Sequence, residues 1–359
     1  MNKNHTPKNE PQINSTITST TPEKKKHKKL KITLITLVSL ILVIAIVMFT
    51  YYNHKLNLIK YDKGADNNVV VDDDPGETYD DINASASKLD EYENNLTVSG
   101  GNTITSKNVI NILLLGTDER TDEFNENARA DSICLLSLNT KENTIKLISF
   151  ERGMAVPIVG TGKDDWLTHT FRYGGANLTV NTLEDCFKLN IDNYVRINFY
   201  SFKPIVDAIG GIDITLTAAE ANALGLKAGV NHLNGSQAIS YSRLRKIDSD
   251  WYRIQRQRNV IKACLSNLDS LSALELNSLI DKVLPMIITD MTKNDINSLT
   301  SIAIKLLGTG FSTQTEGMTI PAAGTYGSKI GMGGRSMFAC DFDENKAIID
   351  KFLYGQTSN

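Results

Sequence analysis

The stretch Val109-Ile-Asn-Ile-Leu-Leu-Leu-Gly116 decides the fold of this chain. It is an apolar run, which is typical of a strand covered on both faces. Similar runs at residues 132–138 and 145–150 predict two more buried strands, and the polar residues between them predict a hairpin turn. Helical periodicity follows at residues 180–187 and 250–268. Because strands alternate with helices, we expect an α/β fold: a three-layer αβα sandwich with a mixed central sheet.

An uncharged apolar segment lies nearer the N-terminus, at residues 32–51. About 20 helical residues at roughly 1.5 Å each reach about 30 Å, the thickness of the hydrocarbon core of a bilayer. Lysines precede the segment, so the positive-inside rule places the N-terminus in the cytoplasm. No small-residue cleavage site follows it, which favours a retained anchor over a cleaved signal peptide. We therefore expect a single-pass cell-membrane protein with a transmembrane signal-anchor helix at residues 30–52 and its C-terminal domain outside the cell.

Charge is distributed unevenly on the two sides of this segment. We interpret residues 1–29 as a basic cytoplasmic tail and residues 53–107 as an acidic extracellular linker. The catalytic domain is expected at residues 108–357. The formal net charge of -3 argues against a nucleic-acid-binding protein. The four cysteines form no Cys-x-x-Cys pair, which argues against a structural zinc site and leaves disulfide pairing open.

Charged residues stand at the ends of the three predicted strands. Asp118 and Arg120 follow the first strand, Arg129 and Asp131 open the second, and Arg152 follows the third. The ends of buried strands are where open α/β sheets bind ligands, and a pair of carboxylates there suits Mg²⁺ (or Mn²⁺). The alternative is structural: Asp118 would cap a turn, and Asp131 would form a surface pair with Arg129.

A second group of arginines lies further along the chain. Arg243 and Arg245 would point to the same side as Tyr241 in an extended segment, and two adjacent guanidiniums suit a phosphate between them. Arg253 and Gln257 share one face of the helix predicted next, although a solvated structural helix fits the same pattern. The sequence has no nucleophile motif such as Gly-x-Ser-x-Gly. A phosphate site with a divalent ion and no covalent nucleophile indicates phosphoryl transfer.

Seven segments of the chain occur in the order found in one family. They are Asn111-Ile-Leu-Leu-Leu-Gly-Thr-Asp-Glu-Arg120, Arg129-Ala-Asp131, Ser149-Phe-Glu-Arg152, Tyr173-Gly-Gly175, Gly210-Gly-Ile212, Tyr241-Ser-Arg-Leu-Arg245 and Asp250-x-x-Arg-x-x-Arg-Gln257. Together, behind one anchor helix, they resemble the LytR-CpsA-Psr (LCP) family of bacterial cell-envelope proteins. No single motif is specific, but the ordered set is.

The resemblance implies a specific reaction. An anionic glycopolymer, such as teichoic acid or a capsular polysaccharide, would pass from a polyprenyl-pyrophosphate carrier to the 6-hydroxyl of N-acetylmuramic acid in peptidoglycan. The polyprenyl chain would occupy a long apolar pocket. The resemblance makes Asp118 and Asp131 the magnesium carboxylates and, with Arg152, the catalytic residues. The pyrophosphate would be held by Arg152, Arg243, Arg245 and Arg253, with Arg120, Arg129 and Gln257 beside them.

Two positions depart from the family pattern. Gly153 stands where the family has aspartate after its strand-end arginine, and Trp166 stands where it has lysine. Glu151 neighbours the lost carboxylate, but on a strand it would point to the other face. The paired loss would either leave local charge balanced or signal a changed acceptor. Alternative functions are therefore a polyprenyl-pyrophosphate hydrolase and a non-catalytic envelope regulator, and the sequence leaves the oligomeric state open.

Overall fold

The computed structural model separates the chain into two compact units, Met1–Lys55 and Leu56–Asn359. It describes residues 42–44, 46–47, 49–51, 53–62, 99–118, 128–159, 163–245, 247–310, 314–330 and 336–355. In the first unit, the described residues from 42 to 55 are helical. The predicted tail, most of the predicted anchor and the acidic core of the predicted linker lie outside the described residues. Within the described ranges, no helix is both long enough and apolar enough to cross a membrane.

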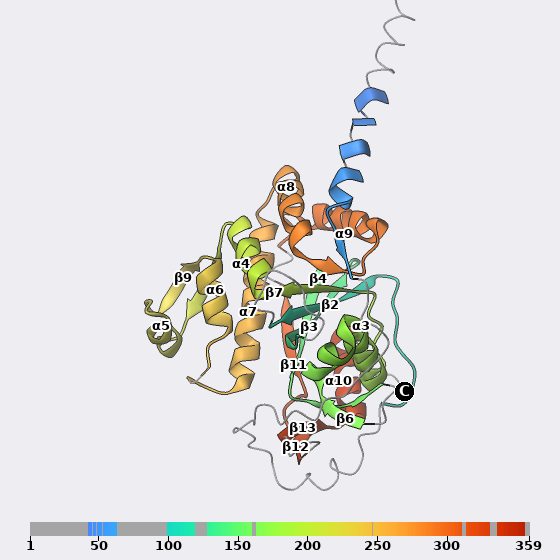
Figure 1. Cartoon of the computed structure of the whole chain (residues 1–359), viewed down its shortest axis with the longest axis vertical. Helices are drawn as coiled ribbons and strands as arrows, with labels where there is room; N and C mark the ends of the chain where they lie inside the picture. Colours follow the sequence, from blue (N-terminus) through green and yellow to red (C-terminus); the bar gives the residue numbers. More distant parts are fainter. Residues whose placement is uncertain are drawn as a thin grey trace, which may run out of the picture. The chain divides into compact units, whose positions relative to one another are not determined.

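A seven-stranded mixed sheet forms the centre of the second unit, as expected (Figure 1). Its strands in spatial order are β1 (Lys60–Tyr61), β10 (Ile288–Thr289), β7 (Asn193–Asn198), β2 (Val109–Thr117), β3 (Ala130–Asn139), β4 (Thr144–Phe150) and β11 (Glu316–Ile320). Strands β2, β3 and β4 run antiparallel, whereas β7 is parallel to β2 and β11 is parallel to β4. The edge strand β1 lies in residues 53–107, which were predicted from the sequence to be a linker.

Helices cover both faces of this sheet, because successive side chains of the central strands point to opposite sides. Leu113 and Leu115 pack with α3 (Leu167–Phe187) and α10 (Phe342–Tyr354) on one face. Leu114 packs on the other face with α7 (Asp250–Asp269) and α9 (Lys293–Leu306). The buried-strand pattern therefore predicted the layers correctly, and α7 has nearly the predicted bounds.

A separate lobe flanks the sheet. It contains α4 (Phe199–Ala208), β8 (Ile212–Leu216), α5 (Ala218–Leu224), β9 (Gly229–Leu233) and α6 (Gly235–Ser242). Its buried residues form a cluster that includes Val260 of α7, so α7 belongs to the lobe and to the sheet layer at once. Figure 1 shows the lobe on the side of α7 away from α3 and α10.

The remaining elements are short. They are α8 (Ala273–Val283), the 3-10 turn η2 (Leu284–Met286), and the two-stranded sheets of β5 (Ala155–Ile158) with β6 (Lys163–Trp166) and of β12 (Tyr326–Ile330) with β13 (Ser336–Cys340). Helix α3 begins well before the predicted residues 180–187 and bends at Gly174 and Gly175. Gly175 has φ +65°, a left-handed conformation that favours glycine.

Candidate functional site

A β-bulge shapes the end of the sheet where the candidate residues gather. The register between β2 and β3 shifts between Gly116 and Thr117. Gly116 pairs with Ser132 and Thr117 pairs with Ala130, so Asp131 is the extra residue. A bulge interrupts pairing and re-aims the side chain of the extra residue. Asp131 consequently lines a cavity at the end of β2.

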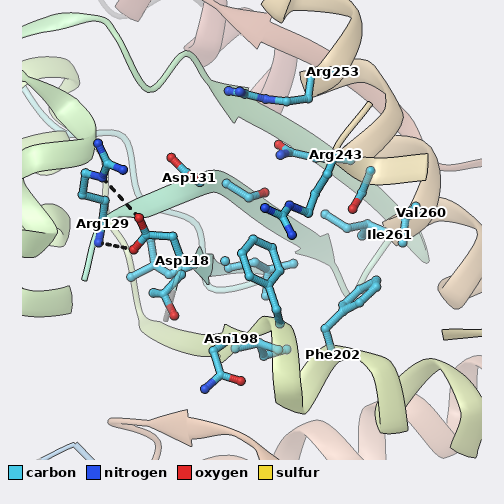
Figure 2. Close-up of a pocket in the computed structure, with 18 of the residues that line it drawn as sticks. Asp118, Arg129, Asp131, Asn198, Phe202, Arg243, Arg253, Val260 and Ile261 are labelled. Atoms are coloured by element: carbon cyan, nitrogen blue, oxygen red, sulfur yellow. Dashed lines mark hydrogen bonds and ion pairs between the residues drawn. The ribbon is translucent and has the colours of Figure 1, made fainter. Parts of the chain in front are cut away.

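Asp118 and Arg129 face each other across the same end of the sheet. The Asp118 carboxylate accepts from the backbone N–H and from Nε of Arg129, at 2.8 and 3.2 Å (Figure 2). The two side chains are 24% and 28% exposed, so this ion pair fixes geometry but contributes under about 1 kcal/mol. Arg129 thus pairs with Asp118, whereas the alternative interpretation of the sequence paired it with Asp131.

A buried network of charges connects Asp131 to α7. Arg152 donates to Asp131 at 2.6 Å and, through Nε, to Asp250 at 3.5 Å. Asp250 in turn accepts from Arg253 at 2.6 Å. The side chains of Arg152 and Arg253 are only 5% and 4% exposed, so both cations depend on these carboxylates in place of water. Arg253 lines the cavity directly. Arg152 does not line it, but its ion pair with Asp131 holds that lining residue in place.

The same network sets the ionisation of Asp131. Burial alone would raise the pKa of this carboxyl, but the positive charges of Arg152 and Arg253 outweigh burial and hold the pKa below its usual range. Asp131 is therefore a carboxylate at neutral pH and a weak proton acceptor. That state suits contact with a cation better than it suits general-base catalysis.

Glu151 lies beside the network, and the prediction that its side chain points to the other face of a strand was wrong. Strand β4 ends at Phe150, so the alternation that would turn Glu151 to the other face does not reach it. Its side chain is completely buried and accepts from the backbone N–H of Gly153 at 3.1 Å. Burial and the neighbouring charge of Asp250 raise the pKa of Glu151 to about 8. The Glu151 carboxyl group thus folds back to the turn at Gly153. There it interacts electrostatically with Arg152 and Arg253.

Arg243 and Arg245 come from the loop between α6 and α7. The guanidinium carbon of Arg243 lies 4.4 Å from the centroid of the Phe199 ring, a cation–π contact. Figure 2 shows its side chain extending toward Asp118 and Asp131. The prediction that Tyr241, Arg243 and Arg245 point to one side of an extended segment was wrong, because Tyr241 belongs to α6 and its side chain is buried. The two arginines nevertheless reach the same cavity.

Many of these residues line one cavity of about 640 Å³, whereas Arg152, Glu151 and Asp250 lie behind its lining. Its polar lining includes Asp118, Arg129, Asp131, Arg243, Arg245, Arg253 and Gln257. Four arginines oppose two aspartates there, which favours an anionic ligand. Its apolar lining includes Leu114, Leu115, Val195, Ile197, Phe199, Phe202, Val260 and Ile261. The cavity therefore matches a ligand with an anionic head and an apolar tail.

The structure brings together nearly all of the site residues predicted from the sequence. Asp118, Asp131 and the arginine pair line the same cavity, as the prediction required. Arg120 lies outside the described residues. Arg152 is predicted to grip the pyrophosphate, and the structure places it among carboxylates instead of on the lining.

The apolar wall contributed by β7 and α4 was not predicted from the sequence. Val195 and Ile197 alternate along β7, and Asn198 ends that strand and caps α4 by accepting from the backbone N–H of Ser201. A strand followed by an N-cap residue is a sequence signal for such a strand-to-helix turn. Because β7 is parallel to β2, this turn lies at the same end of the sheet as Asp118.

Two carboxylates remain for a divalent ion. Among the residues that the structure describes, no group of three or more histidine, cysteine, aspartate or glutamate side chains is placed to hold a metal. Mg²⁺ often takes only one or two carboxylates and completes its shell with water and substrate phosphates. The carboxyl oxygens of Asp118 and Asp131, beside a wall of arginines that would attract the phosphates, fit that coordination chemistry.

Comparison with known proteins finds one family that matches most of the chain. Residues 76–350 match the LytR_cpsA_psr family. A Bacillus mycoides protein named polyisoprenyl-teichoic acid--peptidoglycan teichoic acid transferase TagU is 37% identical over 174 residues, which are 48% of this chain and 56% of that protein. The protein of the same name from Halalkalibacterium halodurans is 34% identical over 193 residues, 52% of this chain and 63% of that protein. The chain thus spans about three fifths of these relatives.

Solved structures share the fold. A structure titled "TagT bound to LIIa-WTA" is 27% identical, has a TM-score of 0.56, and matches 69% of this chain and 91% of that chain. B. subtilis TagT is 26% identical with a TM-score of 0.55, over 71% of this chain and 98% of that one. B. subtilis TagV, at 24% identity and a TM-score of 0.56, covers 69% and 98% and supports the fold alone.

Proposed function

We propose, from the premise that the chain belongs to the LytR_cpsA_psr family, that it transfers an anionic glycopolymer from a polyprenyl-pyrophosphate carrier to peptidoglycan. The observation that carries this proposal is the cavity itself, in which guanidiniums and aliphatic side chains line one continuous space. A polyprenyl pyrophosphate has the matching division between an anionic head and an apolar tail. The relatives named as teichoic acid transferases favour teichoic acid as the polymer class.

In this proposal the arginines orient the pyrophosphate and stabilise its leaving half. Arg243, Arg245 and Arg253 contact its oxygens from the α7 side of the cavity, while the prenyl chain packs against Phe202 and Ile261. A sugar hydroxyl attacks the phosphorus that carries the polymer, and the bond from that phosphorus to the bridging oxygen breaks. Polyprenyl phosphate leaves with the electron pair of that bond. Positioning and charge neutralisation are the main contributions of a protein to such a transfer.

The two aspartates would share the metal in the proposed reaction but differ as proton acceptors. The lowered pKa of Asp131, caused by Arg152 and Arg253 against the effect of burial, makes it a poor base. We assign acceptance of the hydroxyl proton to Asp118, whose carboxylate Arg129 holds in a fixed orientation. Mg²⁺, bound by Asp118 and Asp131, would neutralise charge on the phosphates when present.

The location of the proposed reaction follows from its substrates. A polyprenyl carrier is dissolved in the membrane, so we propose that residues 30–52 anchor the chain there and that the domain faces the peptidoglycan. The uncharged run at residues 32–51 and the lysines before it support that orientation.

One assay tests the reaction and separates it from hydrolysis. The full chain is incubated with radiolabelled polyprenyl-pyrophosphate-linked teichoic acid, with and without peptidoglycan, in the presence of Mg²⁺ or a chelator. We expect label to become covalently attached to peptidoglycan, and Asp118→Ala and Arg243→Ala to abolish the attachment. Release of free phosphorylated polymer regardless of peptidoglycan would identify a hydrolase. Binding of the lipid-linked polymer without either product would identify a regulator.

A further inference from the structure

The loop between α6 and α7, described at residues 243–245 and 247–249, presents two like charges to the cavity. Arg243 and Arg245 both line it, and both come from a segment between two helices. Two neighbouring guanidiniums repel each other in the absence of an anion, and ordering a loop residue costs on the order of 1–2 kcal/mol of conformational entropy. The Phe199 ring holds the Arg243 side chain from inside the cavity, and contacts outside the cavity stabilise the backbone of the loop.

Arg256, on the second turn of α7, makes the contacts that fix it. Its Nη1 and Nη2 atoms each donate to one carboxylate oxygen of Asp248 at 2.7 Å, a bidentate pair. Nη2 also donates to the backbone carbonyl of Leu244 at 2.8 Å. Leu244 lies between the two cavity arginines, and Asp248 lies near the end of the loop, so one guanidinium ties both parts of the loop to the helix.

The surroundings of Arg256 make this contact persistent. Arg256 is only 2% exposed, and Glu220 of α5 lies 3.5 Å from its Nη1 atom. Burial alone would lower the pKa of Arg256, but hydrogen bonds and charge from Asp248 and Glu220 outweigh burial and raise it. The guanidinium stays charged and is balanced by two carboxylates. Lysine could not replace it, since an ammonium has no planar fork.

We infer that Arg256 is a positioning residue, whose fork to Asp248 and the Leu244 carbonyl sets the loop that presents Arg243 and Arg245 to a pyrophosphate. Arg256 is not part of the cavity lining, so it acts through the loop instead of touching the ligand. The inference rests on the proposed function, because it takes pyrophosphate as the group that the loop binds.

The test compares the head and the tail of the ligand. Dissociation constants are measured by calorimetry for the detergent-solubilised full chain with geranylgeranyl diphosphate and with geranylgeraniol, which lacks the diphosphate. Arg256→Lys should weaken diphosphate binding about 10- to 100-fold, the effect expected of a misplacement of about 1 Å. Binding of the alcohol should stay within about twofold, since the apolar wall is untouched. Hydrogen exchange of the loop amides should become faster.

Arg258→Lys is the matched control. Arg258 lies two residues further along α7 and donates to the Met318 carbonyl at 2.6 Å and the Thr319 hydroxyl at 2.9 Å, away from the loop. This variant should keep the preference for the diphosphate. Asp248→Asn removes the charge but keeps the shape, and it should reproduce the Arg256→Lys effect in weaker form. It replaces the Arg256→Lys variant in the test if that variant folds poorly.

The outcomes distinguish the two proposals. One outcome would overturn the positioning role alone. In it, wild type prefers the diphosphate, and the Arg256→Lys and Asp248→Asn variants keep both that preference and slow hydrogen exchange of the loop. Wild type that binds diphosphate and alcohol equally would overturn the proposed function, and the positioning role with it. Equal loss of diphosphate preference in Arg258→Lys would show a general effect of destabilising α7 and would also overturn the role.

Discussion

Replacing Arg152 with glutamine should cost far more stability than the same change at Arg129. Both arginines pair with a carboxylate at the same end of the sheet, but the Arg152 side chain is 5% exposed and the Arg129 side chain is 28% exposed. Arg152 also reaches Asp250, so Arg152→Gln leaves two carboxylates short of a cation. Breaking one partner of a buried pair costs about 3–5 kcal/mol. We expect about 3 kcal/mol, because Asp131 keeps 22% of its side chain in water.

The measurement is guanidinium denaturation of the solubilised full chain at neutral pH, with wild type, Arg152→Gln and Arg129→Gln side by side. Arg129→Gln should shift the free energy of unfolding by under about 1 kcal/mol, as expected of a surface pair. Equal losses in the two variants would refute the reasoning, because burial would then not decide the strength of these pairs. A second readout is the pKa of Asp131, which should rise in Arg152→Gln since its nearest cation is gone.

Three further predictions concern stability. The pKa of Glu151 is raised to about 8 by burial and Asp250, so the group stabilises the fold below its ordinary pKa and that contribution is lost as pH rises toward 8. Thermal unfolding of Glu151→Gln should therefore vary less with pH between about 5 and 8 than that of wild type, and parallel curves would contradict this. A Cβ added at Gly235 would lie 2.2 Å from the backbone oxygen of Lys203, so Gly235→Ala should lower the unfolding free energy by about 1–3 kcal/mol or more; an unchanged denaturation midpoint would show that α4 and α6 separate freely. Thr292→Ala removes the capping box of α9 and should lower the free energy of unfolding by about 1 kcal/mol in the same assay. An unchanged free energy of unfolding would show that water replaces the cap at no cost.

The sequence predicted the sheet well because burial leaves a strong pattern. The run ending at Gly116 is typical of a strand with two covered faces, and β2 has that environment. The short strand β6 escaped because its four residues include Asp164 and Asp165 and give no strand periodicity. Its partner β5 is equally short and contains Pro157, which argues against a strand. The first half of α3 escaped because the glycines at its bend interrupt the helical pattern.

The site was predictable in membership but not in geometry. The ordered motifs identified Asp118, Asp131 and the arginine pair, and the structure gathers them at one cavity. The sequence could not predict that carboxylates enclose Arg152, because it does not show whether a charged side chain is buried or exposed to solvent. The bridging role of Asp250 was missed for the same reason, since it depends on contacts between distant segments.

The bulge at Asp131 has a consequence for how the chain tolerates change. Deleting a single residue from the start of β3 would restore regular pairing with β2, and the sheet would remain intact while the carboxylate turned elsewhere. Such a shortened chain would keep its sheet, but it would lose Asp131 from the cavity lining and leave the buried Arg152 short of one carboxylate. Length at this point of the backbone, and not only the identity of the side chain, is therefore under functional constraint.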